Sequence, residues 1–596
     1  MTRFRRPGDA RRGRAWWIAG LTGGLGLALA YTAWVLHGSK PDPAVTSPPV
    51  PDPVSAVAEG PILLGDVTAG TGITFVHTHG GSGEQYIVEA MTGGVALFDY
   101  DGDGLIDIYF LNATPLPRGS QVGPAPTNRL YRNNGDWTFT DVTEEAGVAD
   151  TGYGLGVTIG DYNNNGLPDI YVNNFGPNVM YRNNGDGTFT DVTAETGVAD
   201  GDKVGAGASF FDMDGNGYLD LYSANYVEFA YELNPRRIIG GYHRAPSPLD
   251  FAPEPDTLFR NNGDGTFTDV SEDSGIGAHR GTGMGMVAGD FNNSGHVDVF
   301  ICNDVWPNFL FENDGTGRFR EVGLSSGVAY DQFGRANGSM GVDAADYNNN
   351  GFIDFFMTAY QTEPPVLYRN LGNGFFEDFT LDSGAGEGST PHVNWGCGFV
   401  DFDNDGYRDI FVANGHLEPM IEQIDRLAAY RAPNVVLRNM GNGRFENVTA
   451  SAGDGLAVRG ASRGTGFDDL DNNGRVDVVV QNSDGKPTIL RNETENRNHW
   501  LQIRLRGVTS NRDAVGARVT VTAGDLTLID EVRSGRGYQS HHGTRLHFGL
   551  GPRAGVDRVE VRWPGGAVEA FEVEGADRLV TLAEGRGREF DGDAPR

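Results

Sequence analysis

The segment that decides the fold is Asp401–Asn414, DFDNDGYRDIFVAN, and six close copies of its first nine residues occur elsewhere in the chain. Positions 1, 3, 5 and 9 of every copy carry an oxygen-bearing side chain, and position 6 is always glycine. Oxygen ligands that alternate along a short loop, with a glycine that permits a sharp turn, can wrap a hard cation. The repeat therefore predicts a series of cation-binding loops.

These four positions supply the candidate metal ligands of all seven loops. They are Asp99, Asp101, Asp103, Asp107, Asp161, Asn163, Asn165, Asp169, Asp212, Asp214, Asn216, Asp220, Asp290, Asn292, Ser294, Asp298, Asp346, Asn348, Asn350, Asp354, Asp401, Asp403, Asp405, Asp409, Asp469, Asp471, Asn473 and Asp477. All-oxygen sites suit calcium, whereas magnesium retains more of its water and softer metals prefer His or Cys. We therefore expect up to seven Ca²⁺ ions. The loops at Asp99 and Asp401 contain the most carboxylates and should bind most strongly, and the loop at Asp290 should bind most weakly.

The flanks of the loops predict strands. Segments such as Gly396–Val400 (GCGFV) precede the loops, and β-branched or aromatic segments such as Ile410–Asn414 (IFVAN) follow them. An EF-hand would instead place helices there and close its loop with glutamate. A second motif, clearest in Leu258–Ser271 (LFRNNGDGTFTDVS), predicts a β-hairpin with a tight turn. Each unit thus contains four strands.

Seven units of four strands describe a β-propeller with seven blades. The seventh unit stops after Leu490–Asn492 and lacks its last strand, while an orphan copy of that strand stands at Leu64–Thr68, LGDVT. We predict that this N-terminal strand completes the seventh blade and closes the ring, which removes an exposed sheet edge. The alternative is that Leu64–Thr68 is only linker.

Three insertions interrupt the units. They are residues 227–256, 331–340 and 416–433. The segment 418–430, EPMIEQIDRLAAY, predicts a short amphipathic helix. Loops on one face of a propeller commonly form its binding surface. Candidates for that surface are Tyr242, His243, Arg244, Phe251, Trp306, His392, Trp395 and His416, for which ordinary loop packing is the simpler interpretation.

No nucleophile–base pair and no open metal site is recognisable in the sequence, so no catalytic residue is predicted. The formal charge of −34 argues against a nucleic-acid partner, because phosphates would be repelled. Cys302 and Cys397 occupy different repeat positions, which predicts two free buried thiols and no disulfide.

The N-terminus predicts export. Residues 1–14 are basic, and residues 15–36 include an uncharged apolar run from Trp16 to Leu36 that is long enough to cross a bilayer. The arginines should stay in the cytoplasm, with the body of the chain outside. We favour an uncleaved anchor; the alternative is a signal peptide cleaved near Ala28–Ala30. Residues 37–60 are rich in proline and predict a semi-rigid linker.

The units resemble FG-GAP/VCBS repeats, as in the integrin α-chain propeller. Trp395–Pro419, WGCGFVDFDNDGYRDIFVANGHLEP, is similar to bacterial relatives of cartilage acidic protein, and Asn498–Gly566, with NHWLQIRLRG, GRGYQSHHGTRLHFGLG and VDRVEVRWPGG, resembles an ASPIC/UnbV domain. This resemblance covers about residues 62–575. It implies an exported, calcium-loaded propeller in bacteria, followed by a small β domain, with no settled activity.

We assign residues 61–495 to the propeller, 496–585 to the ASPIC/UnbV domain and 586–596 to a tail. Short alternating strands in the second domain predict a small β-sandwich. His541 and His542 are neighbours, and neighbouring strand residues face opposite ways, so an ordinary turn is a better interpretation than a metal site.

Two functions remain open at this stage. The first is a membrane-tethered binding or adhesion module for an unknown protein or glycan, located at the bacterial inner membrane with its body in the periplasm or exterior, or secreted after cleavage. The second is an extracytoplasmic enzyme that acts on polysaccharide or lipid, with its site on the inserted loops. The absence of a catalytic motif favours the binding module.

Overall fold

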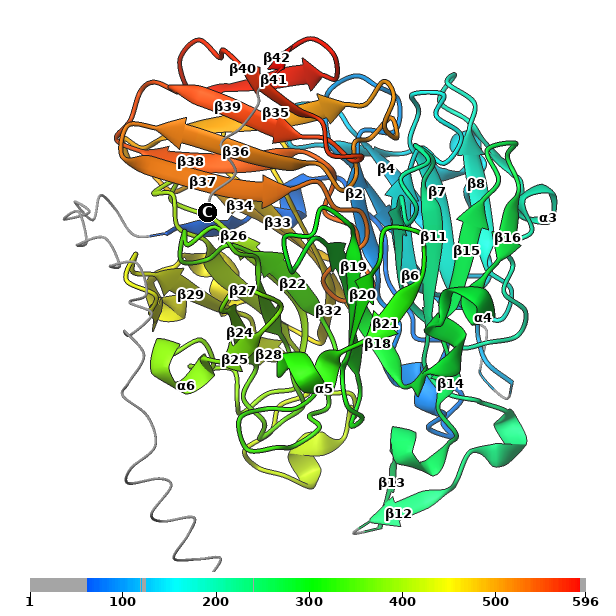
Figure 1. Ribbon diagram of the computed structural model, residues 1–596. Coiled ribbons are helices and arrows are strands. Elements are labelled where there is room, and N and C mark those ends of the chain that lie inside the picture. The colour runs from blue at the N-terminus through cyan, green and yellow to red at the C-terminus, as the bar shows by residue number, and fades with distance from the viewer. Residues whose placement is uncertain (1–61, 118, 120–124, 240, 590–596) are drawn as a thin grey trace, which may run out of the picture. The chain divides into compact units, whose positions relative to one another are not determined.

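The computed structural model describes residues 62–117, 119, 125–239 and 241–589, which belong to one compact unit. Over these residues the fold is all-β and rich in repeats, with seven four-stranded antiparallel sheets (Figure 1). The sheets are β2–β5 (Val95–Phe98, Asp107–Phe110, Arg129–Asn133, Phe139–Asp141), β6–β9 (Tyr153–Gly160, Asp169–Phe175, Val179–Asn183, Phe189–Asp191), β10, β11, β15 and β16 (Gly205–Phe211, Asp220–Asn225, Thr257–Asn261, Phe267–Asp269), β18–β21 (Gly283–Gly289, Asp298–Asn303, Phe309–Asn313, Phe319–Glu321), β22–β25 (Val342–Ala345, Asp354–Met357, Val366–Asn370, Phe376–Asp378), β26, β27, β29 and β30 (Asn394–Val400, Asp409–Asn414, Val435–Asn439, Phe445–Asn447), and β32, β33, β34 and β1 (Ser462–Asp468, Asp477–Asn482, Thr488–Asn492, Leu64–Asp66).

The N-terminal strand completes the last sheet, as the sequence predicts. Strand β1 pairs antiparallel with β34, with Leu64 opposite Asn492. The Thr68 hydroxyl accepts the Ile489 N–H at 2.8 Å, and the Thr68 N–H donates to Asp66 Oδ1 at 2.9 Å. The same Asp-x-Thr arrangement follows the fourth strand of other sheets, so the interpretation of this segment as linker is wrong.

Each fourth strand is followed by a single helical turn. These turns are α2 (Thr143–Ala146), α3 (Thr193–Thr196), α4 (Ser271–Ser274), α5 (Gly323–Ser326), α6 (Thr380–Ser383), η7 (Thr449–Ser451) and η1 (Thr68–Gly70). Most end at a glycine with positive φ, which leaves the chain free to turn towards the next sheet.

The first strands of the sheets converge, and glycine permits their close approach. Each first strand contacts the next in the order β2, β6, β10, β18, β22, β26, β32, and β32 contacts β2. One glycine in or just before each first strand faces a backbone carbonyl of the next sheet, and a Cβ there would lie between 1.9 and 2.8 Å from that oxygen. These glycines are Gly94, Gly156, Gly207, Gly285, Gly341, Gly396 and Gly464. A methyl group at any of them would push two sheets apart.

Seven asparagines close a second circuit at the ends of the third strands. Each side-chain amide donates to a carbonyl of its own loop and to the carbonyl of loop position 2 in the preceding sheet; Asn439, for example, donates to Arg408 and to Tyr347. Asn133, in the first repeat, donates to Leu470 of the last at 2.8 Å, so the circuit is closed. The seven residues are Asn133, Asn183, Asn261, Asn313, Asn370, Asn439 and Asn492.

The C-terminal module, residues 499–589, consists of two further sheets, of three and five strands. Its strands are β35 (His499–Arg506), β36 (Arg518–Ala523), β37 (Leu526–Glu531), β38 (Leu546–Gly551), β39 (Arg558–Arg562), β40 (Val568–Phe571), β41 (Arg578–Ala583) and β42 (Arg588–Glu589). Strand β41 pairs in parallel with β35, an arrangement that the sequence prediction of a small β-sandwich did not include. It also assigned β42 to a tail, although Glu569 and Glu589 pair in the five-stranded sheet.

The insertions contain little regular structure. They hold the hairpin β12 (Arg237–Ile239) and β13 (Tyr242–Arg244) and the turns η3 (Tyr231–Leu233), η4 (Pro248–Asp250) and η6 (Ile421–Gln423). Further short elements are β14 (Glu254–Pro255), β17 (Arg280–Gly281), β28 (Ala432–Pro433), β31 (Arg459–Gly460), η2 (Ile87–Ala90), η5 (Ile276–Ala278) and η8 (Asp454–Ala457).

The predicted amphipathic helix over 418–430 is wrong, because only η6 forms there. The Asp425 carboxylate accepts the Leu427 N–H at 2.9 Å and ends the turn. Ile421 and Ala428 are buried but Leu427 is 85% exposed, so the apolar residues do not form one buried helical face.

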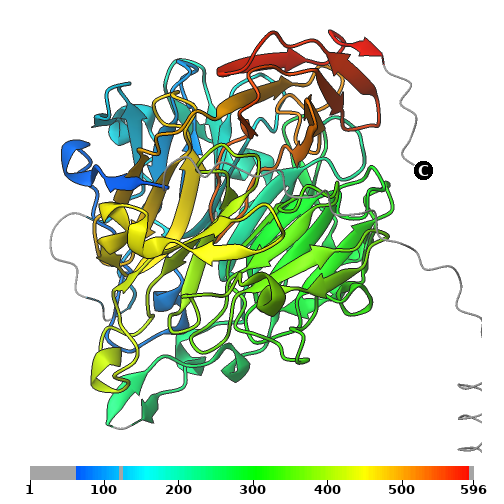
Figure 2. The same ribbon diagram turned by 90° about the vertical axis from the view of Figure 1, so that its left-hand side faces the viewer.

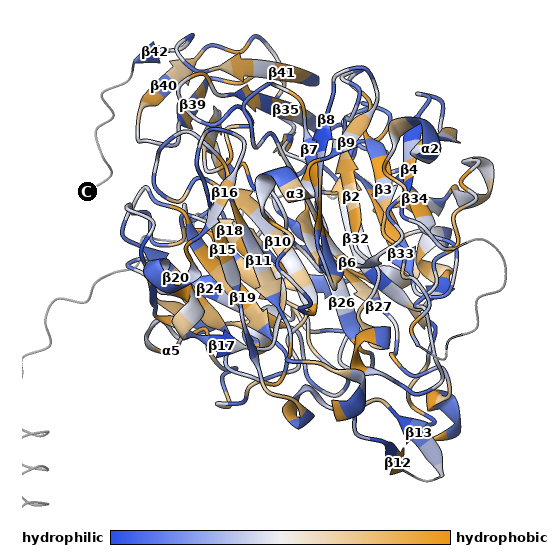
Figure 3. Cartoon of the chain, turned by 90° about the vertical axis from the view of Figure 1, so that its right-hand side faces the viewer, coloured by the Kyte–Doolittle hydropathy of each residue, from blue (hydrophilic) through white to orange (hydrophobic). Residues whose placement is uncertain are grey.

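Apolar residues gather in the strands, and polar residues gather in the connections (Figure 3). Cys302 and Cys397 are both free and buried, as expected. No helix among the described residues is long and apolar enough to span a membrane. The predicted anchor, residues 15–36, the basic segment before it and the linker up to residue 60 lie outside the described residues.

Candidate metal sites and the insertion face

The seven loops share one geometry, which the loop from Asp401 to Asp409 illustrates. The Asp401 carboxylate accepts the N–H groups of Asp405 at 3.0 Å and Gly406 at 2.9 Å. The Asp409 carboxylate accepts the N–H groups of Phe402 at 3.1 Å and Asn439 at 2.8 Å. The first and last aspartates therefore hold the loop in shape while their remaining lone pairs stay available.

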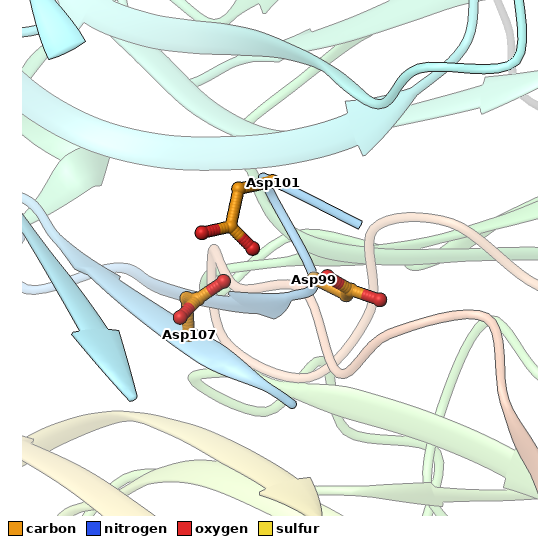
Figure 4. A group of neighbouring side chains, drawn as sticks. All are labelled: Asp99, Asp101 and Asp107. Carbon is orange, nitrogen blue, oxygen red and sulfur yellow. The ribbon is translucent and has the colours of Figure 1, made fainter. Parts of the chain in front are cut away.

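In four loops the carboxylates of positions 1, 3 and 9 converge, with one oxygen of each within 4.8 Å of the others. These groups are Asp99, Asp101 and Asp107; Asp212, Asp214 and Asp220; Asp401, Asp403 and Asp409; and Asp469, Asp471 and Asp477. Figure 4 shows the first group, in which the carboxylates of Asp101 and Asp107 face each other and Asp99 lies beside them. Such a group of oxygens matches the ligand set of a hard divalent cation.

In three of these four loops the third position carries a buried oxygen with no hydrogen-bond partner; Asp101 of the remaining loop is exposed. Asp214 and Asp471 each leave Oδ1 without a partner, although the other oxygen of each contacts an arginine of the same sheet. Asp403, which is 1% exposed, also has an unsatisfied Oδ1. A buried carboxylate oxygen without a donor is costly unless a cation satisfies it, so these atoms fit a metal ligand.

Burial also makes the charged forms unfavourable without a cation. It raises the pKa of Asp107 to about 8. Burial and the neighbouring carboxylates of Asp401 and Asp403 together raise the pKa of Asp405 to about 9. A bound divalent cation reverses this effect, because it stabilises the ionised carboxylates.

The three remaining loops keep the same backbone but replace carboxylates with neutral groups at positions 3 and 5. Asn163, Asn292 and Asn348 each accept the N–H of position 5, at 2.9 to 3.1 Å. Position 5 also forms local hydrogen bonds. In the acidic loops, Asp103 and Asp405 each accept the N–H of the residue two positions later, and neither belongs to the converging groups. That the neutral side chains at positions 3 and 5, and the aspartates at position 5, act as metal ligands stays a prediction.

The loops lie on one face of the ring, the metal-loop face, and the C-terminal module covers it. Contacts reach the loops one by one: Arg504 lies 3.5 Å from Asp99, the Asp161 N–H donates to Asp513 at 2.7 Å, and Gln502 donates to Asp469 at 2.9 Å. The cores are continuous, because buried residues of the module and of β10, β11 and β19 belong to one cluster. Figures 1 and 2 show strands β35–β41 against this end of the sheets.

One segment of the module enters the middle of the ring. We call residues 533–545, between β37 and β38, the axial loop. His541 exchanges hydrogen bonds with Val95 and Leu97 of β2, both at 3.0 Å, and Gly537 exchanges hydrogen bonds with Val342 of β22. Gln539 accepts from Val157 of β6 at 3.2 Å. Predicted only as a turn, this loop fills the axis, and burial lowers the pKa of its His541 to about 3.

The insertions lie on the opposite face, the insertion face, because they follow the second or fourth strands rather than the first. A pocket of about 30 Å³ opens there between residues 79–90, the third insertion and the seventh sheet. His79, Glu89, Tyr430 and Arg463 line it. Its volume admits one small group rather than a whole ligand.

The pocket contains a histidine–carboxylate pair. His79 Nδ1 lies 2.5 Å from Asp484 Oδ2. Burial lowers the pKa of His79, but the hydrogen bond and charge of Asp484 raise it by more, so the net pKa is raised. Sequence reasoning missed this pair, since its members lie 405 residues apart and neither belongs to a recognisable motif.

Arg463 is buried at the base of this pocket, at 1% exposure. It donates to the carbonyls of Ala90, Ser462 and His416 and stacks on Trp395, with Cζ 4.0 Å from the ring centroid. Tyr538 of the axial loop packs edge-on against the same Trp395 ring, at 5.0 Å between centroids. Through Tyr538, which crosses the middle of the propeller-like ring of sheets, the C-terminal module therefore contacts Trp395, the residue on which Arg463 stacks.

Four of the predicted surface residues make contacts that show their place in the structure. Trp395 and His416 are buried and hydrogen-bonded, which matches the simpler interpretation of loop packing. Phe251 packs on Phe229 in the first insertion. Arg244 forms an ion pair with Glu418, which joins the first and third insertions.

Family models identify both parts of the chain. An FG-GAP-like repeat model matches residues 99–172, 161–223, 251–301, 290–357 and 346–412. A model described as ASPIC and UnbV matches residues 507–589.

Curated relatives include human cartilage acidic protein 1, 28% identical over 499 residues, which cover 82% of this chain and 62% of that protein. The mouse protein is 28% identical over 382 residues, which cover 62% of this chain and 53% of that protein. The chain thus spans between half and two thirds of the length of these relatives. A solved structure of an Agrocybe aegerita lectin that recognises non-reducing terminal N-acetylglucosamine aligns with 19% identity and a TM-score of 0.35, over 61% of this chain and 82% of that one.

Proposed function

Because the chain belongs to the family of FG-GAP repeat proteins with a C-terminal ASPIC/UnbV domain that includes cartilage acidic protein 1, we propose that it is a calcium-loaded, seven-bladed β-propeller that acts as an extracytoplasmic binding module. Seven four-stranded sheets and two closed circuits of contacts support the propeller. Calcium is supported by the converging carboxylates and by their unsatisfied buried oxygens.

The ligand of this module binds the insertion face. The observation that carries this proposal is that the C-terminal module covers the metal-loop face and fills the axis, which leaves the insertions as the irregular, exposed loops. Ile238, Leu249 and Leu427 expose 60%, 62% and 85% of their surfaces there. Exposed apolar side chains on loops held by a rigid frame favour a role in recognition.

The proposal places the body outside the cytosol, tethered by the N-terminal apolar segment. Extracellular calcium can be millimolar, so loops of modest affinity would be filled there. The partner is a protein or a glycan. The formal charge of −34 disfavours nucleic-acid partners, because like charges repel.

A matched pair of surface variants tests where the ligand binds. Ile238→Asp places a charge on the insertion face, and Val508→Asp places one on the C-terminal module at nearly equal exposure, 60% against 61%. The purified chain is applied to a glycan array and to partner pull-downs from envelope extracts, with calcium or with EDTA. Any ligand retained by the wild type in calcium should be lost with Ile238→Asp and kept with Val508→Asp; the reverse pattern would contradict this assignment.

A second candidate, an enzyme acting on polysaccharide or lipid, is favoured by one observation. His79, which is paired with Asp484, lines a pocket together with Glu89 and Tyr430, and a histidine oriented by a carboxylate is a common general base. Turnover on the ligands retained above, compared between wild type and His79→Gln, distinguishes the two functions. Product formed by the wild type and abolished by His79→Gln would establish the enzyme; binding without product would exclude it for those ligands.

A further inference from the structure

We propose that Arg562 of the C-terminal module occupies the cation position of the fourth loop, residues 290–298, and that this loop is a cation-independent docking point. The inference rests on the proposed binding of calcium by the acidic loops. It separates one member of the series from the others, because this loop holds the module on the ring whether or not calcium is present.

The sequence of the fourth loop has lost the charge that attracts a cation. Positions 3 and 5 are Asn292 and Ser294, where the loop at Asp401 has two aspartates. Ser294 also has the shortest side chain found at position 5 of any loop. The third strand of this sheet carries Glu312 at the place of the arginine that contacts position 3 in the acidic loops, and Glu312 forms its own ion pair with Arg320 at 2.6 Å.

The structure places a guanidinium on the first ligand of the fourth loop. Arg562 Nη2 donates to Asp290 Oδ2 at 2.5 Å, and the Asp290 side chain is 3% exposed. Among the described residues, Asp290 is the only first-position aspartate whose carboxylate accepts a hydrogen bond from an arginine. Its counterpart Asp401 accepts only the backbone N–H groups of its own loop.

The backbone of the same loop is held by two more residues of the module. Arg518 donates to the Asp290 carbonyl at 2.8 Å and to the Asn293 side chain. Glu531 accepts the Asp290 N–H at 3.1 Å and also pairs with Arg518 at 2.7 Å.

The loop at Asp469 has a similar backbone contact, because Arg545 donates to the Asp469 carbonyl at 2.6 Å and Asp468 accepts the Asp469 N–H at 2.8 Å. Its first carboxylate accepts from Gln502, however, so among the described residues only the fourth loop adds a hydrogen bond from an arginine to that carboxylate.

These contacts disfavour a second positive charge. Arg562 and Arg518 already compensate Asp290 and Glu531, so a divalent ion at this loop would lie beside two guanidinium groups without the carboxylates to offset them. An arginine fixed by a charge-assisted hydrogen bond is the stable alternative in a site that lacks ligands.

The first test compares calcium binding in two isosteric variants of the full chain. Asp401→Asn weakens an acidic loop, and Asp290→Asn changes the same position of the fourth loop. Equilibrium dialysis with elemental analysis counts calcium per chain over a range of free calcium. We expect Asp401→Asn to lower the affinity for one ion at least tenfold, and Asp290→Asn to leave the binding curve unchanged.

The outcomes separate this inference from the proposed function. If both variants lose an ion, the fourth loop binds calcium and the inference is overturned while the proposed function stands. If neither changes the curve and the wild type holds no calcium, the proposed function fails and the inference falls with it.

A gain-of-binding variant does not depend on the folding of Asp290→Asn. The substitutions Asn292→Asp and Ser294→Asp turn DFNNSG into DFDNDG, the sequence that begins the loop at Asp401. Combined with Arg562→Met, they should add one calcium per chain. With Arg562 retained, the same two substitutions should give at least tenfold weaker binding at the new site. Equal binding with and without Arg562 would overturn the proposal.

Discussion

The metal-loop face repeats one chemical pattern in every sheet, whereas the insertion face has three long connections with no shared sequence. On the first face, backbone hydrogen bonds, asparagine amides and converging carboxylates recur at equivalent positions. On the second face, contacts such as Arg244–Glu418 and His79–Asp484 occur once each. Contacts that recur in every sheet are therefore those that maintain the ring. Contacts that occur only once indicate where this chain has binding chemistry of its own.

The two faces are nevertheless joined through the axis. The axial loop starts from the module on the metal-loop face. Its Tyr538 packs against Trp395, and the other partner of Trp395 is Arg463, which lies under the insertion-face pocket. Buried aromatic contacts therefore connect the two faces along the axis.

Removal of calcium should give the largest effect and should act first on the metal-loop face. A site that is saturated at a hundred times its dissociation constant adds about 2.7 kcal/mol, so four acidic loops would contribute on the order of 10 kcal/mol. We expect EDTA to lower the melting temperature by roughly 10 °C or more, and calcium to restore it. Differential scanning calorimetry measures the shift, and hydrogen exchange should increase at residues 401–409 before it increases at 416–433.

Magnesium is the control for this experiment, since it should restore less stability than calcium at an equal concentration. A melt that EDTA leaves unchanged, in a sample shown by elemental analysis to be free of metal, would refute the proposed role of the ion.

Truncation of Tyr538 tests the connection between the faces. Tyr538 is fully buried, and its hydroxyl donates to the Met91 carbonyl at 2.8 Å. Tyr538→Ala should cost about 3–5 kcal/mol through the cavity it leaves. Tyr538→Phe keeps the ring and should cost about 1 kcal/mol through the lost hydrogen bond. Urea unfolding measures both.

The more informative measurement is hydrogen exchange at residues 86–92, on the insertion face. Tyr538→Ala should accelerate exchange there, although the substitution lies in the C-terminal module, and Tyr538→Phe should not. Exchange confined to the axial loop and the module in both variants would show that the two faces are independent.

Much of the ring could be predicted because its signals are local and repeated. The four strands of each unit, the hairpins and the pairing of Leu64–Asp66 with the last sheet follow from motifs that recur in register. The converging carboxylates at Asp99, Asp212, Asp401 and Asp469 follow for the same reason. Pattern reasoning failed where tertiary contacts decide: in the segment expected to be a helix, Ile421 is buried but Leu427 is exposed, so its apolar residues do not share one buried face.

The site features that sequence reasoning missed depend on contacts distant in the chain. Arg562 meets Asp290 across 272 residues, and His79 meets Asp484 across 405 residues. Two signals were nevertheless present. A glycine in or just before the first strand of each sheet is constant in the sequence, and so is the first asparagine of each hairpin motif. The partners of these residues become visible only when the ring is closed.

A glycine-to-alanine pair tests the convergence of the sheets, on which both faces depend. A Cβ at Gly156 would lie 1.9 Å from the Ala206 carbonyl oxygen, whereas a Cβ at Gly555 meets nothing within 4 Å. Gly156→Ala should cost about 1–3 kcal/mol or more because the neighbouring strand must move. Gly555→Ala should stay within about 0.5 kcal/mol of the wild type. Chemical denaturation measures both values, and equal stabilities would show that the sheets tolerate a wider axis.

The smallest expected effect concerns pH on the insertion face. Burial lowers the pKa of His79, but the neighbouring Asp484 and Glu89 raise it by more, so the net pKa lies above the usual value. Burial raises the pKa of Asp484, but its contact with His79 lowers it by more, so the net pKa lies below the usual value. A histidine whose pKa is raised on folding stabilises the protein fully below its unfolded pKa of about 6.5, and this contribution is lost as the pH rises through the folded value. Both side chains are partly exposed, so solvent screening limits the effect to less than about 1 kcal/mol.

His79→Gln should therefore destabilise the chain at pH 6 and become nearly neutral by pH 8.5, when unfolding is measured in urea at both values. The control is His499→Gln, which removes a second His–Asp contact, with Asp577 at 2.7 Å on the C-terminal module, where the carboxylate is 48% exposed. Because that contact is better solvated, its loss should matter less at pH 6. If His79→Gln lowers the free energy of unfolding as much at pH 8.5 as at pH 6, the His79–Asp484 pair stabilises the protein through packing and not through the charge of His79.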